Sequence, residues 1–444
     1  MRISKVGGRA SPISLRVRKA LRYVSITTLL FALTVLNSVQ MMPLYYDQEA
    51  VRLQDVMRQK FENESHIDAS STRQEQSNSQ HFVSTSKPSV VTLLRLDWTN
   101  QVPQSPLARR IQQHQMDCSL PLGNFKFRNR FGLGSDLHVW SQAMCNAMHF
   151  GVRIRTVWDW LWMDQQSCQS IIIEENKKTK RTLGSPLQCY FPRAELQCPS
   201  DSEIVLEHPI FDSALFNISG GRRQGTVNWD CSSILSSESG DGNEMQRRFQ
   251  FQEAGMEFLF GQISQHVVEE ANRQHFLVFG SGNTSQTTTP NDLITVHIRW
   301  GDKKREMKLL QIQQYLNAID QLVQGRPRPV VNVFLATEDP EAVQQFQQQA
   351  PTDWKIYIDQ FYTELLPHRN GNEYNGVPKA ATALEGRMGT IALGSLLVAL
   401  EANEFVITTE SNWSRLLNEL RKSIVDPTCH GCTKVMDLKP IQSI

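Results

Sequence analysis

The stretch Val296-His297-Ile298-Arg299-Trp300-Gly301-Asp302-Lys303 decides the fold that this chain is expected to adopt. Residues 293–296, which lead into it, are mostly apolar or β-branched, as is typical of a buried parallel strand. Behind the stretch, apolar residues recur at spacings of three and four, which predicts a helix: Leu309, Ile312, Leu316, Ile319 and Val323. A parallel strand that ends in Arg and Lys before such a helix is where open α/β sheets hold anionic ligands.

Arg299 is the residue of this stretch that best suits a diphosphate, because its planar guanidinium donates two parallel hydrogen bonds. Two plainer interpretations compete with binding. The charged residues from Lys303 to Lys308 also fit the solvated start of a helix, and His297 alone also fits a hydrogen-bonded core histidine.

The rest of the second half alternates strands and helices in the manner of a nucleotide-binding sheet. Strands are expected at 293–299, 330–337, 354–358 and 404–409, with helices between them. This pattern predicts an α/β fold.

The spacing His-x-Arg-x-x-Asp-Lys resembles the donor-binding motif of the α1,6-fucosyltransferases and their bacterial nodulation relatives. It is also close to the pattern of the protein O-fucosyltransferases. Glu306 and Tyr315 stand nine residues apart, as do a catalytic glutamate and a tyrosine in the α1,6 family. The resemblance therefore extends beyond the first motif.

Three further segments resemble the same family in the same order. Residues 333–340, which contain Glu338 and Asp339, are similar to its second motif, and residues 405–415, which contain Ser411, are similar to its third. Upstream, Gly132 and Gly134 form a glycine turn before a helix, where the family has a glycine loop that faces the nucleotide. Taken alone, this turn is also explained as a helix start with Asp136 as the N-cap.

The resemblance implies a GT-B-like architecture. The length of the chain beyond the stem suggests two domains, at residues 118–285 and 286–444, with the boundary in a Gly-, Ser-, Thr- and Asn-rich linker at 280–290. The second would be a Rossmann-like domain that binds a nucleotide sugar. The implied activity is inverting transfer of fucose from GDP-fucose to a glycan hydroxyl, most simply the α1,6 position of the core GlcNAc of N-glycans. The alternatives are a protein O-fucosyltransferase, a transferase that uses another nucleotide sugar, and a noncatalytic glycan-binding membrane protein.

The resemblance also implies roles for individual residues. The catalytic residues would be Glu306 as the base, Lys303 and Arg299. The donor-binding residues would be His297, Arg299, Gly132, Gly134, Tyr315, Glu338, Asp339 and Ser411. No metal and no cofactor are expected, since the sequence contains no Asp-x-Asp pair. Asp339 has an alternative role as an N-cap, because Pro340 follows it.

Two positions depart from the family pattern. Trp300 stands where the family has a second arginine, and Ser395 stands where the family has the aspartate that reads guanine. Both departures leave the identity of the nucleotide open.

The N-terminus predicts a membrane anchor. Residues 1–22 carry seven basic and no acidic residues, and residues 23–42 carry no charge, which is long enough to span a bilayer. A single-pass type II protein of the Golgi membrane is expected, with a cytoplasmic tail (1–22), a transmembrane anchor (23–42) and a flexible stem (43–117). A cleaved signal peptide or a transit peptide is the alternative.

The remaining composition fits a lumenal enzyme. Without the seven basic residues, 39 Lys and Arg face 45 acidic residues, which gives no general attraction to nucleic acid. The expected partners are an N-glycan or glycoprotein acceptor and the Golgi membrane, and a homodimer remains an option.

The eight cysteines permit four disulfides, whose pairing the sequence leaves open. A structural disulfide is favoured for Cys429 and Cys432 over half of a zinc site or a redox pair. Glycosylation sequons begin at Asn63, Asn217, Asn283 and Asn412. The last lies in a site turn and is expected to stay unmodified.

Overall fold

The computed structural model describes residues 93–439, apart from 128–130, 158–159, 170–171, 177–178, 183, 196–197, 199–204, 207–233, 235–242, 281–287, 302, 304–307, 327–329 and 369–375. The expected tail, anchor and first part of the stem therefore lie outside the described residues, as do Glu306 and the sequons at Asn63, Asn217 and Asn283. Within the described part, no helix has the length and apolar character needed to cross a membrane.

The larger sheet is parallel throughout and has the strand order β10-β9-β6-β7-β8. Its strands are β6 (Leu293–Ile298), β7 (Asn332–Thr337), β8 (Lys355–Ile358), β9 (Glu404–Ile407) and β10 (Lys434–Asp437). The four strands expected from the sequence are confirmed to within two residues at each end. β10 was not predicted, because it is short and begins and ends with a charged residue.

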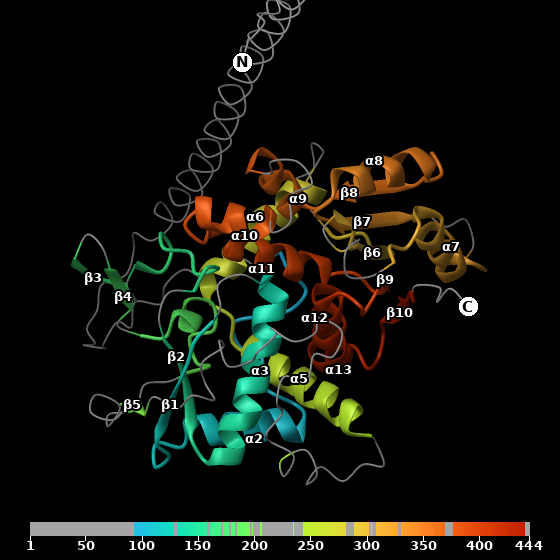
Figure 1. The fold of residues 1–444 in the computed structure, drawn as a ribbon. Coiled ribbons are helices and arrows are strands. Elements are labelled where there is room, and N and C mark those ends of the chain that lie inside the picture. The colour runs from blue at the N-terminus through green and yellow to red at the C-terminus, as the bar shows by residue number, and fades with distance from the viewer. Residues whose placement is uncertain are drawn as a thin grey trace, which may run out of the picture. The chain divides into compact units, whose positions relative to one another are not determined.

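Helices cover both faces of this sheet (Figure 1). On one face, Ile294, Val296 and Val333 pack with α7 (Ile312–Val323) and α8 (Pro340–Gln349). On the other face, Leu293 and Phe334 pack with α6 (Gln265–Phe279) and α11 (Arg387–Ala399). Since successive side chains of a strand point to opposite faces, a sheet covered on both sides needs a continuous apolar run. The helix predicted from the apolar spacing is confirmed as α7.

A glycine allows α6 and α11 to approach closely. A Cβ atom added to Gly394 would lie 2.9 Å from the Gln274 amide nitrogen and 2.9 Å from Glu270 Cγ. The same Gln274 amide donates to the Ile391 carbonyl oxygen at 2.9 Å. A larger residue at position 394 would therefore separate the two helices.

A smaller parallel sheet, of order β2-β1-β5, lies earlier in the chain. It consists of β1 (Leu122–Phe125), β2 (Arg153–Thr156) and β5 (Val205–Leu206), and α3 (Leu133–Phe150) links the first two. The buried Glu195 carboxylate joins these elements, because it accepts hydrogen bonds from Trp140 Nε1 and Thr156 Oγ1, both at 2.7 Å. The described residues thus form an α/β fold with parallel sheets.

Further elements complete the described part. They are α2 (Pro106–Met116), the antiparallel pair β3 (Ile172–Asn176) and β4 (Thr179–Thr182), α5 (Glu244–Phe260), α9 (Gln360–Leu365), α10 (Gly376–Ala383), α12 (Asn412–Leu420) and α13 (Asp426–Thr428). Two 3-10 turns (Pro186–Cys189 and Leu366–His368) and a π-helical turn (Arg421–Val425) lie between them.

Part of the expected stem is folded. Residues 93–117 contain α2 and contribute Leu96, Trp98 and Ile111 to the core that also holds α3 and α11. The indole of Trp98 is fully buried. The tryptophans Trp160 and Trp162 are also buried.

Three disulfides join described cysteines: Cys118–Cys198, Cys168–Cys189 and Cys429–Cys432. Cys145 is disulfide-bonded as well. The predicted disulfide at the Cys-His-Gly-Cys segment is therefore confirmed. His266 approaches Cys168 and Cys189, but both sulfurs are used in their mutual bond and do not act as metal ligands.

Asp136 is a buried carboxyl group in α3, and its protonation links the stability of the fold to pH. Its carboxyl group is buried and accepts a hydrogen bond from Trp160 Nε1 at 3.0 Å. Burial raises the pKa of Asp136 from 3.8 to about 8. Because the folded-state pKa is above the unfolded one, the stability contributed by this group is fully present below about pH 4 and is lost as the pH rises through 8.

We therefore expect Asp136→Asn to flatten the pH dependence of the free energy of unfolding between pH 5 and 8. One proton accounts for up to about 1.4 kcal/mol per pH unit. Denaturant unfolding of the native chain and the variant at several pH values measures the difference. Asp353→Asn, at an exposed carboxylate, is the control. Parallel curves for the native chain and Asp136→Asn would mean that Asp136 is ionised when folded.

Candidate active site

The strand order of the larger sheet defines where a ligand can bind. From β6 the chain passes to β7 and then β8 on one side, and it returns to β9 on the other side of β6. The connections that leave β6 and β9 therefore diverge at the carboxyl ends of these two strands. In open α/β sheets, ligands bind in the opening that such a reversal creates.

Arg299 leaves the carboxyl end of β6 at this point. Its guanidinium donates to the Trp300 carbonyl oxygen at 2.8 Å and forms an ion pair with Glu338, which follows β7. The side chains of Arg299 and Glu338 retain 17% and 18% of their exposure. The structure thus brings two of the predicted donor-binding residues together, at a place that solvent reaches. Lys303 lies four residues beyond Arg299 and is half-buried.

Trp300 points into the core on the opposite face of the sheet. Its indole is 7% exposed, packs in the cluster that contains α7, and donates to the Leu310 carbonyl oxygen at 2.9 Å. Trp300, which departs from the pattern that the sequence resembles, is therefore a core residue of this fold.

His297 lies two residues before Arg299 and is much more deeply buried. Its Nδ1 atom is 2.6 Å from Ser414 Oγ in α12, and the same hydroxyl lies 3.4 Å from the Thr408 backbone nitrogen. Burial, together with the nearby Arg299 charge, lowers the pKa of His297 to about 3. The imidazole is therefore neutral, and it has the hydrogen bond expected of a core histidine. Donor binding by His297 stays a prediction.

Two helix amino ends meet beside these strands. Asn412, the first residue of α12, donates through its side-chain amide to Ser135 Oγ in α3 at 2.5 Å. A Cβ atom on Gly134 would lie 3.3 Å from Trp413, so glycine keeps the two helices in contact. Backbone N–H groups and the positive ends of helix dipoles favour anions at such places. Asn412 is half-buried, and its lack of glycosylation stays a prediction.

The N-caps of α3 and α12 are Gly132 and Ser411. Gly132 is the N-cap of α3, whereas Asp136 lies inside the helix and bonds to Trp160, so the interpretation of Asp136 as the N-cap is wrong. Ser411 is the N-cap of α12, is 1% exposed, and makes no capping hydrogen bond through its side chain.

Asp339 and Tyr315 occupy structural positions. Asp339 Oδ1 accepts from the backbone nitrogens of Glu341 at 2.9 Å and Ala342 at 3.2 Å, which confirms its alternative role as the N-cap of α8. Tyr315 is 1% exposed inside the α7 core, and burial raises its pKa. Contact of either residue with a donor stays a prediction.

Asp359 is a buried carboxylate that the sequence analysis did not select. It follows β8, is 3% exposed, and caps α9 through a hydrogen bond from the Phe361 backbone nitrogen at 2.9 Å. Ser395 Oγ in α11 donates to the same carboxylate oxygen at 2.5 Å. Burial raises the pKa of Asp359 to about 6. Its position directly after a predicted parallel strand is the signal that also pointed to Arg299.

Searches among protein-family models and among curated proteins found no match. Among solved structures, the chain is similar to the fucosyltransferase NodZ from Bradyrhizobium, with 14% identity, 67% of this chain and 93% of that chain covered, and a TM-score of 0.35. It is also similar to NodZ soaked with GDP-fucose (15% identity, 68% and 92% covered, TM-score 0.35) and to POFUT1 in complex with GDP (12% identity, 72% and 99% covered, TM-score 0.32).

Ser414 is expected to be important for the stability of the site. In Ser414→Ala, the buried His297 Nδ1 loses its partner, which costs about 1–3 kcal/mol of unfolding free energy. Ser423→Ala is the matched control, because Ser423 Oγ bonds only a helical carbonyl oxygen, that of Glu419 at 2.8 Å, and its loss should cost less than about 0.5 kcal/mol. Denaturant unfolding of both variants checks this. Equal losses would contradict the role of Ser414.

Proposed function

We propose that this chain is an inverting fucosyltransferase that transfers fucose from GDP-fucose to a hydroxyl of a glycan acceptor. The observation that carries the proposal is the position of Arg299, at the carboxyl end of β6 beside the amino end of α12. This is the place where a doubly wound sheet holds a diphosphate, and the motifs that resemble the fucosyltransferases lie around it.

Arg299 stabilises the departing GDP in this mechanism. Negative charge grows on the β-phosphate as the bond to the sugar breaks, and a preoriented guanidinium binds that charge more strongly in the transition state than in the ground state. The ion pair with Glu338 holds the guanidinium in place before the donor binds. The backbone N–H groups at the amino ends of α3 and α12 add to the positive potential.

Glu306 is the proposed base, which removes the proton from the acceptor hydroxyl either directly or through Lys303. The assignment follows from the resemblance, since Glu306 lies outside the described residues. A carboxylate near its ordinary pKa of ~4.3 is a weak base, so its surroundings must raise that value.

The proposed acceptor rests on the sequence resemblance, and the proposed compartment rests on the charge pattern of the N-terminus. An N-glycan or glycoprotein is the proposed acceptor, with the α1,6 position of the core GlcNAc as the first candidate and a protein hydroxyl as the second. The basic residues before an uncharged stretch of twenty support a type II anchor in the Golgi membrane, with the catalytic part in the lumen.

Asp359 is proposed to supply the carboxylate that reads guanine. The sequence has Ser395 where the family has an aspartate, yet the Ser395 hydroxyl lies 2.5 Å from the Asp359 carboxylate. A carboxylate accepts the two parallel N–H groups of guanine as a pair. β8 is two strands from β6, or roughly 10 Å at the usual strand spacing, a separation that a nucleoside diphosphate can span.

Two substitutions separate binding from chemistry. Arg299→Lys keeps the charge but loses the paired hydrogen bonds, and it should cost about 2–4 kcal/mol of transition-state stabilisation. Glu306→Gln should lower kcat by roughly 10²- to 10⁴-fold while leaving GDP affinity unchanged. Transfer assays with GDP-fucose and calorimetry with GDP, on folded preparations of both variants, test the proposal. Full activity of Arg299→Lys would exclude this donor site.

Substitutions at Asp359 and Ser395 test the proposed contact with guanine. Asp359→Asn keeps an oxygen to cap α9 but accepts only one of the two N–H groups, so discrimination between GDP and IDP should fall by about 1–3 kcal/mol. The double variant Asp359→Ser/Ser395→Asp returns the carboxylate to α11 and should restore the discrimination between GDP and IDP. Calorimetry measures the affinities of the native chain, Asp359→Asn and the double variant for GDP, IDP, UDP and ADP. Equal binding of UDP or ADP by the native chain would favour another nucleotide sugar.

A further inference from the structure

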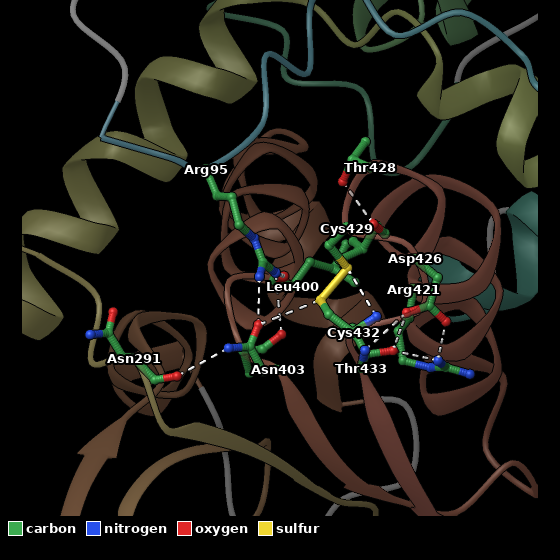
Figure 2. Close-up of a disulfide and its surroundings, with 12 residues drawn as sticks. Arg95, Asn291, Leu400, Asn403, Arg421, Asp426, Thr428, Cys429, Cys432 and Thr433 are labelled. Carbon is green, nitrogen blue, oxygen red and sulfur yellow. Dashed lines mark hydrogen bonds and ion pairs between the residues drawn. A yellow bond between two sulfur atoms is a disulfide. The ribbon is translucent and has the colours of Figure 1, made fainter.

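The Cys429–Cys432 disulfide closes a turn that precedes β10 (Figure 2). Its cysteines are 3 positions apart, whereas those of the Cys118–Cys198 bond are 80 apart. A bond that closes a short loop restrains the unfolded chain much less than one that closes a long loop. The effect of this disulfide is therefore mainly local.

The bond is also accessible to solvent. Cys432 is exposed and Cys429 is half-buried. By contrast, Cys168 and Cys189, which form another disulfide, are only 3% and 2% exposed. Thiol–disulfide exchange requires that a thiolate reach one of the two sulfurs. Cys432 offers such a sulfur.

Hydrogen bonds at the base of the turn would survive loss of the disulfide. The Asp426 carboxylate accepts from Arg421 Nη1 at 2.6 Å and from Thr433 Oγ1 at 2.5 Å (Figure 2). The tip depends more on the covalent ring, because His430 has a φ of 58°, in the left-handed region that residues with a side chain rarely adopt. Reduction should therefore loosen the tip and the start of β10 without unfolding the domain.

β10 relies on contacts at its two ends. Among the described residues it is an edge strand paired only with β9, and none of its 4 residues is buried. At its amino end, the Lys434 N–H donates to the Asn403 carbonyl oxygen at 2.9 Å. At its carboxyl end, Asp437 accepts from the Thr409 backbone nitrogen at 2.9 Å and from Thr409 Oγ1 at 2.7 Å. A strand with so little buried surface opens at a low free energy once one end is released.

The contact with Thr409 links β10 to the candidate active site. Thr409 lies in the turn that connects β9 to α12, and in the same turn the Ser411 N–H donates to the Thr408 carbonyl oxygen at 3.0 Å. We propose that Cys429–Cys432 is an exchangeable disulfide whose reduction by a dithiol loosens β10 and, through Asp437, the β9–α12 turn.

The exchange proceeds in two balanced steps. A thiolate of the dithiol attacks the Cys432 sulfur, the protein S–S bond breaks, and Cys429 leaves as a thiolate that takes up a proton. The second thiol of the reductant loses its proton and attacks the mixed disulfide, which releases Cys432 as a thiolate that is protonated in turn. The protein gains two electrons and two protons, and the dithiol becomes a cyclic disulfide.

Alkylation and hydrogen exchange test the proposal on the full chain. After mild treatment with dithiothreitol, mass spectrometry should find Cys429 and Cys432 alkylated before Cys168 and Cys189. Amide exchange in residues 408–411 and 434–439 should become faster by roughly tenfold, the change expected from losing one loop closure of this length. Exchange in β7 should stay unchanged.

Two variants provide the controls. Cys429→Ser/Cys432→Ser should show the faster exchange without reductant and no further response to it, and Asp437→Ala should loosen residues 408–411 with the disulfide intact. Prior reduction of Cys168–Cys189, or unchanged exchange after Cys429 and Cys432 are alkylated, would overturn the proposal. Weaker GDP binding by the reduced protein is expected too, but this rests on the proposed function. If the oxidised protein binds no GDP, that function fails while the exchange data still decide the role of the disulfide.

Discussion

The burial of β6 on both faces is the constraint on which the site depends. All 6 residues of this strand are buried between two layers of helices. A strand enclosed in this way exposes little of its side chains to solvent, so a charged group that binds a ligand is expected beyond its carboxyl end. The parallel direction of the neighbouring strands brings their carboxyl ends, and the amino ends of the helices that follow, to the same edge. The location of Arg299, Glu338 and Ser411 at one edge follows from this topology.

The basic residues His297 and Arg299, at the end of β6 and just beyond it, differ in how deeply they are buried. His297 and Arg299 are two positions apart and therefore point to the same face of β6. His297 is inside the core, where burial keeps its imidazole neutral and Ser414 satisfies one ring nitrogen. Arg299 lies beyond the last residue of the strand, where it keeps its charge and pairs with Glu338. A difference of one strand repeat thus leaves the neutral imidazole in the core and the guanidinium at the carboxyl end of β6, because an unpaired buried charge is too costly.

The sequence was informative where a pattern is local. Apolar runs and helical spacing predicted β6, β7, β8, β9 and α7, and the charged residue after a strand indicated the candidate site. Contacts between distant segments were not predictable. The N-cap expected at Asp136 failed because Trp160, 24 residues away, provides a buried partner for its carboxylate. The Ser395 departure looked like a lost carboxylate, but the Ser395 hydroxyl donates to the Asp359 carboxylate, 36 residues upstream. The core position of Trp300 depends on the Leu310 carbonyl oxygen beyond the turn.

The amino ends of the strands in the larger sheet make structural contacts, whereas the candidate active site lies at their carboxyl ends. Just before the amino end of β9, Arg95 anchors the start of the described chain. Its guanidinium donates to Asn403 Oδ1 at 2.6 Å and to the Leu400 carbonyl oxygen at 2.8 Å (Figure 2). The buried Glu401 carboxylate accepts the Arg95 backbone N–H, and burial raises its pKa to about 7. Asn403 then receives β10 through its carbonyl oxygen. β9 and β10 run from this end of the sheet to the other, so they connect Arg95 and Asn403 with the candidate active site.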